Sequence, residues 1–121
     1  MKKQSIKQSF FSALRGLIWS FKTQPNLFRG SICGIIALLC SFLFPLSSGE
    51  KILIFFTVLL FFIAEMINTS LEAIVDLITQ TKHKQARIAK DVASGMVLLT
   101  SIGAFLVGLF IFGPYIIKLL R

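Results

Sequence analysis

The chain has 121 residues, of which 55% are hydrophobic and 15% are charged, and its formal net charge is +8. Because soluble domains carry about 25% charged residues, this composition excludes an ordinary soluble domain and favours a membrane protein. The basic side chains border apolar runs, which indicates contact with the membrane surface and argues against nucleic-acid binding. The length allows a single domain, residues 1–121, with so little room for an enclosed site that an oligomer is favoured.

The first predicted element is an amphipathic helix over about residues 4–24. Its apolar side chains, such as Phe10 and Leu14, recur at steps of three and four residues beside Lys7 and Lys22, which predicts a helix lying in the membrane interface. Pro25 is expected to end or turn it. We expect no cleavable signal peptide, because the basic start is followed by an interrupted apolar pattern.

Three membrane-spanning helices are predicted over about residues 27–46, 52–79 and 88–120. Each is long enough to cross the bilayer, which takes about 20 apolar residues. A turn at 45–49 and a polar loop at 80–87 separate them. Gly103 and Gly108 are expected to allow close helix approach. Cys33 and Cys40 share one helix face about 10 Å apart, too far for a disulfide. The predicted fold is therefore an all-α membrane protein with a surface helix and three transmembrane helices.

The distribution of basic residues predicts the orientation of the chain in the membrane. One side carries ten: Lys2, Lys3, Lys7, Arg15, Lys22, Arg29, Lys82, Lys84, Arg87 and Lys90. The other carries three: Lys51, Lys118 and Arg121. We therefore expect the N-terminus and the 80–90 loop to be cytoplasmic.

Four polar residues of the second span form one stripe: Glu65, Asn68, Glu72 and Asp76. On a helix they point within an arc of about 80°. Glu65 is expected about 21 Å from the outer face at 1.5 Å per residue, inside the cytoplasmic half of the bilayer, with Glu72 and Asp76 at headgroup depth. Ionisable groups at such depth cost about 2–3 kcal/mol or more and point to function. The alternative is that Glu65 is protonated or paired with a base on another helix.

Carboxylates at a membrane surface suit proton abstraction from a hydroxyl or ligation of Mg²⁺ with nucleotide phosphates. Lys90 and Asp91 begin the third span on the same side, Lys90 can meet a phosphate as a point charge, and Ser94 shares its face. A phosphate site would have to be built from helix side chains, because the sequence has no Walker loop. A proton- or ion-conducting oligomer and a catalytically silent membrane scaffold remain alternatives.

The segments 64–76 and 89–99 carry the patterns E-x-x-N-[ST]-x-x-E-x-x-x-D and A-K-D. These resemble the signature of the small bacterial diacylglycerol kinase and undecaprenol kinase family, and the resemblance covers nearly the whole chain. It implies a homotrimeric kinase of the bacterial inner membrane, with active sites shared between subunits, that transfers the γ-phosphoryl of MgATP to a lipid hydroxyl. The expected cofactor is Mg²⁺, and the expected partners are ATP, the lipid alcohol and further copies of the chain.

The resemblance also implies roles for individual residues. Glu65 matches the catalytic base, which also contacts the lipid alcohol, and Glu72 matches the metal-binding glutamate. The positions implied near the nucleotide and its phosphates are Ser12, Gln24, Asn68, Glu72, Asp76, His83, Lys90 and Asp91. Trp19 and Ser94 are implied to line the lipid site. From the residues alone, His83 is equally well explained as a solvated loop histidine, and Trp19 and Tyr115 as anchors at the membrane interface.

The sequence departs from the family pattern at Gln24, where a glutamate that serves as a second metal ligand is common. A glutamine amide oxygen can still ligate Mg²⁺ but adds no charge, so weaker metal binding or one metal ion fewer is expected. The amino-acid sequences of several segments resemble the undecaprenol kinase branch more than the diacylglycerol kinase branch. Both alcohols remain open as substrates.

Overall fold

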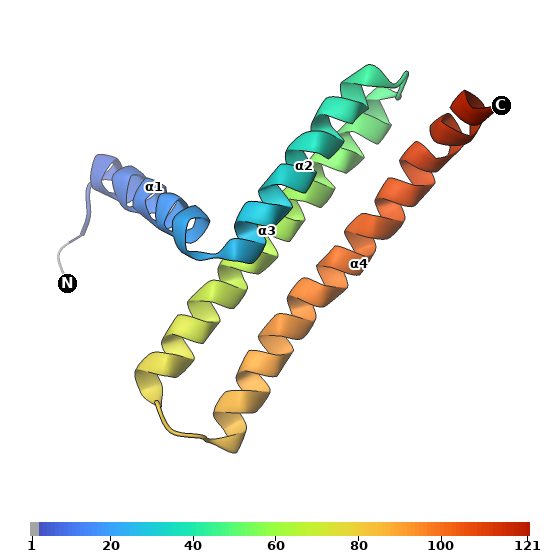
Figure 1. Ribbon diagram of the computed structural model, residues 1–121. Coiled ribbons are helices and arrows are strands. Elements are labelled where there is room, and N and C mark those ends of the chain that lie inside the picture. Colours follow the sequence, from blue (N-terminus) through green and yellow to red (C-terminus); the bar gives the residue numbers. More distant parts are fainter. Residues whose placement is uncertain (1–2) are drawn as a thin grey trace.

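The computed structural model describes residues 3–121 as four helices (Figure 1). They are α1 (Ile6–Thr23), α2 (Pro25–Leu43), α3 (Ser48–Ile78) and α4 (Lys84–Leu120). α2, α3 and α4 run side by side in alternating directions, while α1 projects sideways from the start of α2. All three of these antiparallel helices are long and apolar enough to cross a membrane. The all-α fold with three spanning helices is confirmed; Lys2, counted above for orientation, lies outside the described residues.

Local capping explains where the helices begin. Ser5 and Ser47 each form a capping box, the first with Gln8 and the second with Glu50. In each box the serine Oγ accepts from one backbone N–H and the glutamine or glutamate side chain accepts from another, so two otherwise unpaired donors are satisfied. Pro25 is the first residue of α2, a position where its missing N–H costs nothing.

The predicted loop at 80–87 is too long, because α4 already begins at Lys84. His83 caps this helix: its Nδ1 accepts from the backbone N–H of Gln85 at 3.2 Å. The polar stretch that follows is built from lysine, glutamine, alanine and arginine, which are good helix formers. The turn between α3 and α4 is therefore only residues 79–83, and the two helices extend well beyond the start of α2 (Figure 1).

Most large apolar side chains on the spanning helices are exposed in the single chain, including Phe42, Leu98 and Phe110. This is the expected state of a surface that faces lipid tails, since burial between helices gains little over contact with hydrocarbon. The buried core is small and lies near the α2–α3 turn. Its contiguous cluster consists of Leu46, Ile54 and Ile111, while Leu27, Ala64 and Ala93 are buried elsewhere along the helices.

Close helix approach occurs at Gly30 and Gly34 of α2, where α2 crosses α3. A methyl group built on Gly34 would lie 2.7 Å from Cγ1 of Val58, and one on Gly30 would collide with the ring of Phe61. By contrast, a methyl group on Gly103 or Gly108 would meet nothing within 4 Å in the described chain. The expectation that Gly103 and Gly108 allow close approach is therefore wrong within this chain, and the small-xxx-small pair of α2 has that role.

We expect Gly34→Ala to destabilise the α2–α3 contact by about 1–3 kcal/mol, because the added methyl overpacks a filled interface. Gly103→Ala is the matched control, since its methyl enters open space and alanine favours helix formation. Thermal unfolding of the detergent-solubilised protein measures the difference. Equal unfolding temperatures for the two variants would contradict a tight α2–α3 crossing.

A hydrogen bond joins α3 and α4 at the end opposite the 79–83 turn. The hydroxyl of Tyr115 donates to Oε1 of Glu50 at 3.0 Å, and the same carboxylate oxygen accepts from the backbone N–H of Ser47. Tyr115 therefore links the end of α4 to the capping box of α3 and fixes the register of the two helices.

A candidate lipid-phosphorylation site

The polar stripe of α3 starts at the level where α1 meets α2. Because Gly30 packs on Phe61 and Gly34 on Val58 in antiparallel helices, residues near Pro25 lie level with Glu65. Phe21, near the end of α1, also contacts Phe62, with ring centroids 6.0 Å apart. The amphipathic helix and Glu65 thus lie at one depth. Glu72 and Asp76 follow about two and three turns further along α3.

Glu65 is buried, with 4% of its surface exposed in the single chain. It lies beside Ala64 and Thr69, which are also buried, and the Thr69 hydroxyl donates to the Glu65 backbone carbonyl at 2.9 Å. Within residues 3–121, no cation pairs with the Glu65 carboxylate. The alternative in which Glu65 is paired with a basic group of another helix therefore finds no support in the described chain.

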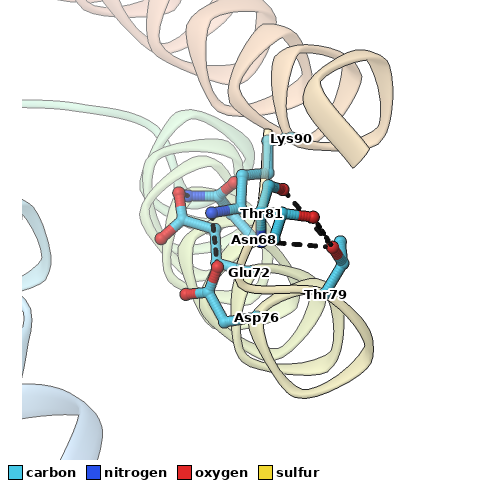
Figure 2. A network of polar contacts seen from close by, with 6 residues as sticks. All are labelled: Asn68, Glu72, Asp76, Thr79, Thr81 and Lys90. Carbon is cyan, nitrogen blue, oxygen red and sulfur yellow. Dashed lines mark hydrogen bonds and ion pairs between the residues drawn. The ribbon is translucent and has the colours of Figure 1, made fainter. Parts of the chain in front are cut away.

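Asn68 and Glu72 form the next step of the stripe. Nδ2 of Asn68 donates to Oε1 of Glu72 at 3.5 Å (Figure 2). This orientation leaves Oδ1 of Asn68 buried without a hydrogen-bond partner among the described residues. A buried polar oxygen without a partner is costly, and amide and carboxylate oxygens are ligands that Mg²⁺ accepts. The pair therefore fits a bound cation or its water.

Asp76 connects α3 to α4. Its Oδ1 accepts from Nζ of Lys90 at 2.5 Å, and Figure 2 shows Lys90 reaching across from α4. Both side chains are partly exposed, so the pair is screened by water and contributes little stability. Its main effect is positional, because it holds the ammonium of Lys90 over the polar stripe. Thr79 and Thr81 pair through their hydroxyls at 3.1 Å and shape the adjoining turn.

A polar cleft of about 830 Å³ opens between the end of α3 and the start of α4. It is bordered by the cations Lys82, Lys84, Arg87 and Lys90, by the carboxylates Asp76 and Asp91, and by His83. The excess of cations suits a polyanion such as a triphosphate. Asp91 also pairs with Arg87, with 3.9 Å between Oδ2 and Nε, in an exposed position.

The structure brings most of the expected site residues into one region, but not those of α1. The stripe and the cleft adjoin through Asp76 and Lys90, and Ser94 follows Lys90 by one helical turn. Gln24 lines a pocket with residues of α1 and α2 alone and donates to Thr23 at 3.5 Å. Ser12 accepts from Arg15 on the exposed side of α1, and Trp19 is half exposed. A single chain thus does not join Gln24 to Glu72.

Among the described residues, no three acidic, histidine or cysteine side chains converge as a metal cage. This agrees with the usual Mg²⁺ site of kinases, where one or two carboxylates act together with the substrate phosphates. The cleft also contains basic residues that the sequence did not single out as site residues. The most notable is Arg87, which was counted above only among the charges that predict the orientation in the membrane. Its spacing of three and four residues from Lys90 and Asp91 was the signal that could have found it.

Comparison with known proteins distinguishes between a lipid kinase, an ion-conducting oligomer and a silent scaffold. The profile of the prokaryotic diacylglycerol kinase family matches residues 11–112. The chain belongs to this family. Membership makes it an ATP-dependent kinase of a membrane lipid, and it favours an enzyme over an ion-conducting oligomer or a silent scaffold.

The relatives of this kinase carry two different substrate names. It is 36% identical over 107 residues to the undecaprenol kinase of Bacillus subtilis (strain 168), covering 88% of this chain and 87% of the relative. It is 38% identical over 101 residues to the diacylglycerol kinase of Synechocystis sp., covering 83% of this chain and 58% of that protein. A diacylglycerol kinase of Pseudomonas aeruginosa is 29% identical over 82 residues, 68% of this chain and 67% of the relative.

Proposed function

We propose that the kinase phosphorylates the hydroxyl of diacylglycerol or undecaprenol at the cytoplasmic face of the bacterial inner membrane. The N-terminus and the 79–83 turn lie in the cytoplasm in this proposal, as the basic residues around them favour. One observation carries it: the buried carboxylate of Glu65 lies at the membrane end of a polar stripe that leads directly into a cationic cleft. A lipid hydroxyl and a soluble nucleotide can therefore meet along one face of α3.

The nucleotide occupies the cleft between α3 and α4 in this proposal. Lys90 contacts the transferring phosphoryl group, since Asp76 already holds its ammonium above the stripe. Arg87, Lys82 and Lys84 offset the remaining phosphate charge, and His83 lies at the rim. Asp91 orients Arg87 through their ion pair. Such fixed cations stabilise the charge of a phosphoryl-transfer transition state.

Glu65 acts as the general base. The lipid oxygen attacks the γ-phosphorus, its proton passes to the carboxylate of Glu65, and the bond between the γ-phosphorus and the bridging oxygen breaks to release ADP. Burial places this carboxylate where water is scarce, and a positioned base contributes about 10²- to 10⁴-fold to such a reaction. Ser94 and Trp19 complete the lipid site in this proposal.

Glu72 and the free Oδ1 of Asn68 are the groups that fit Mg²⁺ bound with ATP. When bound there, the ion would neutralise charge on the phosphates. Gln24 completes this ligand set from a neighbouring copy, because in its own chain it lies at the α1–α2 junction, away from Glu72. Ser12 likewise contacts the nucleotide that is bound to a neighbouring copy. The proposal therefore requires an oligomer with shared sites, and we propose a homotrimer.

We expect Gln24→Glu to lower the Mg²⁺ concentration needed for half-maximal activity several-fold, because a carboxylate adds a charged oxygen ligand where an amide stands. Steady-state rates across a Mg²⁺ titration measure this. Lys22→Gln is the matched control, since it makes the net charge more negative by the same one unit at an exposed position two residues away. An unchanged Mg²⁺ curve in Gln24→Glu, or an equal shift in both variants, would remove Gln24 from the metal site.

The choice of alcohol is tested by incubating the purified kinase with MgATP and with diacylglycerol or undecaprenol in turn. Transfer of labelled γ-phosphate to the lipid is followed in each case. The match to the undecaprenol kinase relative covers a larger share of both chains than the match to either diacylglycerol kinase, and this favours undecaprenol. Phosphorylation of diacylglycerol alone would overturn that preference, and labelling of neither alcohol would overturn the proposed function.

A further inference from the structure

His83 stands just before the first residue of α4 and caps this helix. Its backbone is extended, with φ −134° and ψ 132°, and its Nδ1 accepts from the backbone N–H of Gln85 at 3.2 Å. The first N–H groups of a helix have no partner within the helix, so this bond satisfies one of them. A neutral imidazole whose Nδ1 accepts a hydrogen bond carries its proton on Nε2. The two ring nitrogens of His83 therefore differ, and only Nδ1 is bonded to the helix.

The turn that leads into this cap is also closed by a side chain. The Thr79 hydroxyl accepts from the backbone N–H of Thr81 at 3.3 Å and pairs with the Thr81 hydroxyl at 3.1 Å. Bonds of this kind between a short side chain and the nearby backbone fix the conformation of a turn. Thr79 thus closes one end of the 79–83 turn and His83 closes the other, and Lys82 lies between them at the cleft.

The charges at the start of α4 are unfavourable for a helix. Its first turn contains no acidic residue, whereas Lys84 and Arg87 carry positive charge near the end where the helix dipole is itself positive. Lys90, three residues further on, is held separately by its ion pair with Asp76. Loss of the cap would therefore loosen residues 84–87 and leave Lys90 in place.

We infer that His83 is a positioning residue of the nucleotide cleft that acts through α4, because its cap holds Lys84 and Arg87 where they face the triphosphate. Both cations border the cleft, whereas the capped residue Gln85 does not. Because these two cations need the triphosphate in this cleft, the inference rests on the proposed function. It differs from a direct contact, in which the Nε2–H of His83 would donate to the nucleotide.

Two substitutions separate the cap from a direct contact. Oδ1 of an asparagine is as many bonds from the backbone as Nδ1 of a histidine, and asparagine is a preferred N-cap residue. The amide of a glutamine instead corresponds to Nε2, and glutamine is not a preferred N-cap residue. At saturating lipid alcohol, we expect His83→Ala and His83→Gln to raise KM for ATP by about 2- to 30-fold, the range that the loss of an N-cap represents. Their kcat stays near wild type because Lys90 stays in place, and His83→Asn keeps the wild-type KM.

Ser47→Ala is the matched control, because it removes the N-cap of α3 at the opposite end of the bundle. It should lower the unfolding temperature and leave KM for ATP unchanged. A KM that glutamine restores and asparagine does not would assign His83 to direct nucleotide contact and overturn the inference. Equal rises in all three His83 variants, or no rise in any of them, would overturn it too.

A second measurement needs neither ATP nor lipid. Amide hydrogen exchange in the nucleotide-free protein reports opening of the first turns of α4, where the N–H of Arg87 donates to the carbonyl of His83 at 3.0 Å. We expect faster exchange at residues 87–91 in His83→Ala and His83→Gln, and wild-type exchange in His83→Asn. Unchanged exchange in His83→Ala would overturn the inference. Because exchange does not depend on phosphoryl transfer, failure of the cap is distinguishable from failure of the proposed function.

Discussion

Glu65→Gln is expected to lower lipid phosphorylation by about 10²- to 10⁴-fold, the range that a positioned general base supplies. The amide keeps the size of the buried side chain but cannot accept the proton of the lipid hydroxyl. Because Glu65 lies outside the cleft between α3 and α4, ATP binding should stay within a few-fold of wild type. The two quantities are measured by transfer of labelled phosphate to lipid and by fluorescent nucleotide binding.

Glu50→Gln is the matched control for this prediction. It removes a carboxylate from the same helix, but at the end that pairs with Tyr115 and caps α3. We expect it to retain most of the activity. Full activity in Glu65→Gln, or parallel loss of activity and nucleotide binding, would show that Glu65 is not the base.

Glu72→Gln is expected to raise the Mg²⁺ concentration required for half-maximal activity by at least about 10-fold. The change removes the charged oxygen next to Asn68, whose own Oδ1 has no partner in the described chain, and metal sites lose roughly 10- to 100-fold in affinity when supporting groups are removed. A Mg²⁺ titration of the steady-state rate measures the shift. Saturating Mg²⁺ should restore much of the activity.

Asp91→Asn serves as the control for Glu72→Gln, because Asp91 lies at the cleft rim in an exposed pair with Arg87. It should change the apparent affinity for ATP and leave the Mg²⁺ requirement near wild type. If Glu72→Gln lost activity that no Mg²⁺ concentration restored, while Asp91→Asn shifted the Mg²⁺ curve, the metal assignment would be wrong.

The membrane topology and the polar stripe could be predicted from the sequence because each depends on periodicity along one helix. Runs of about 20 apolar residues define the spans, and the spacing of Glu65, Asn68 and Glu72 fixes their common face. The structure bears out the fold, and the stripe is continuous on α3. The family resemblance added roles to these residues that their spacing alone does not give.

Contacts between helices could not be predicted in this way. The pairing of Asp76 with Lys90 depends on the length of the 79–83 turn, which the sequence suggested was longer. The close approach at Gly34 in place of Gly108 depends on which faces of α2 and α3 meet. Charged helix starts such as Lys84 resemble loops by composition, and only the cap at His83 marks the boundary.

The placement of ATP between α3 and α4, at the end of the stripe that begins with Glu65, is tested most directly by photolabelling. The purified kinase is irradiated with 8-azido-ATP and Mg²⁺, and the labelled peptides are identified by mass spectrometry. We expect labels within residues 75–91, which border the cationic cleft, and we expect these labels to be lost when excess ATP competes. Competable labels confined to residues 44–51, at the opposite end of the bundle, would contradict this placement.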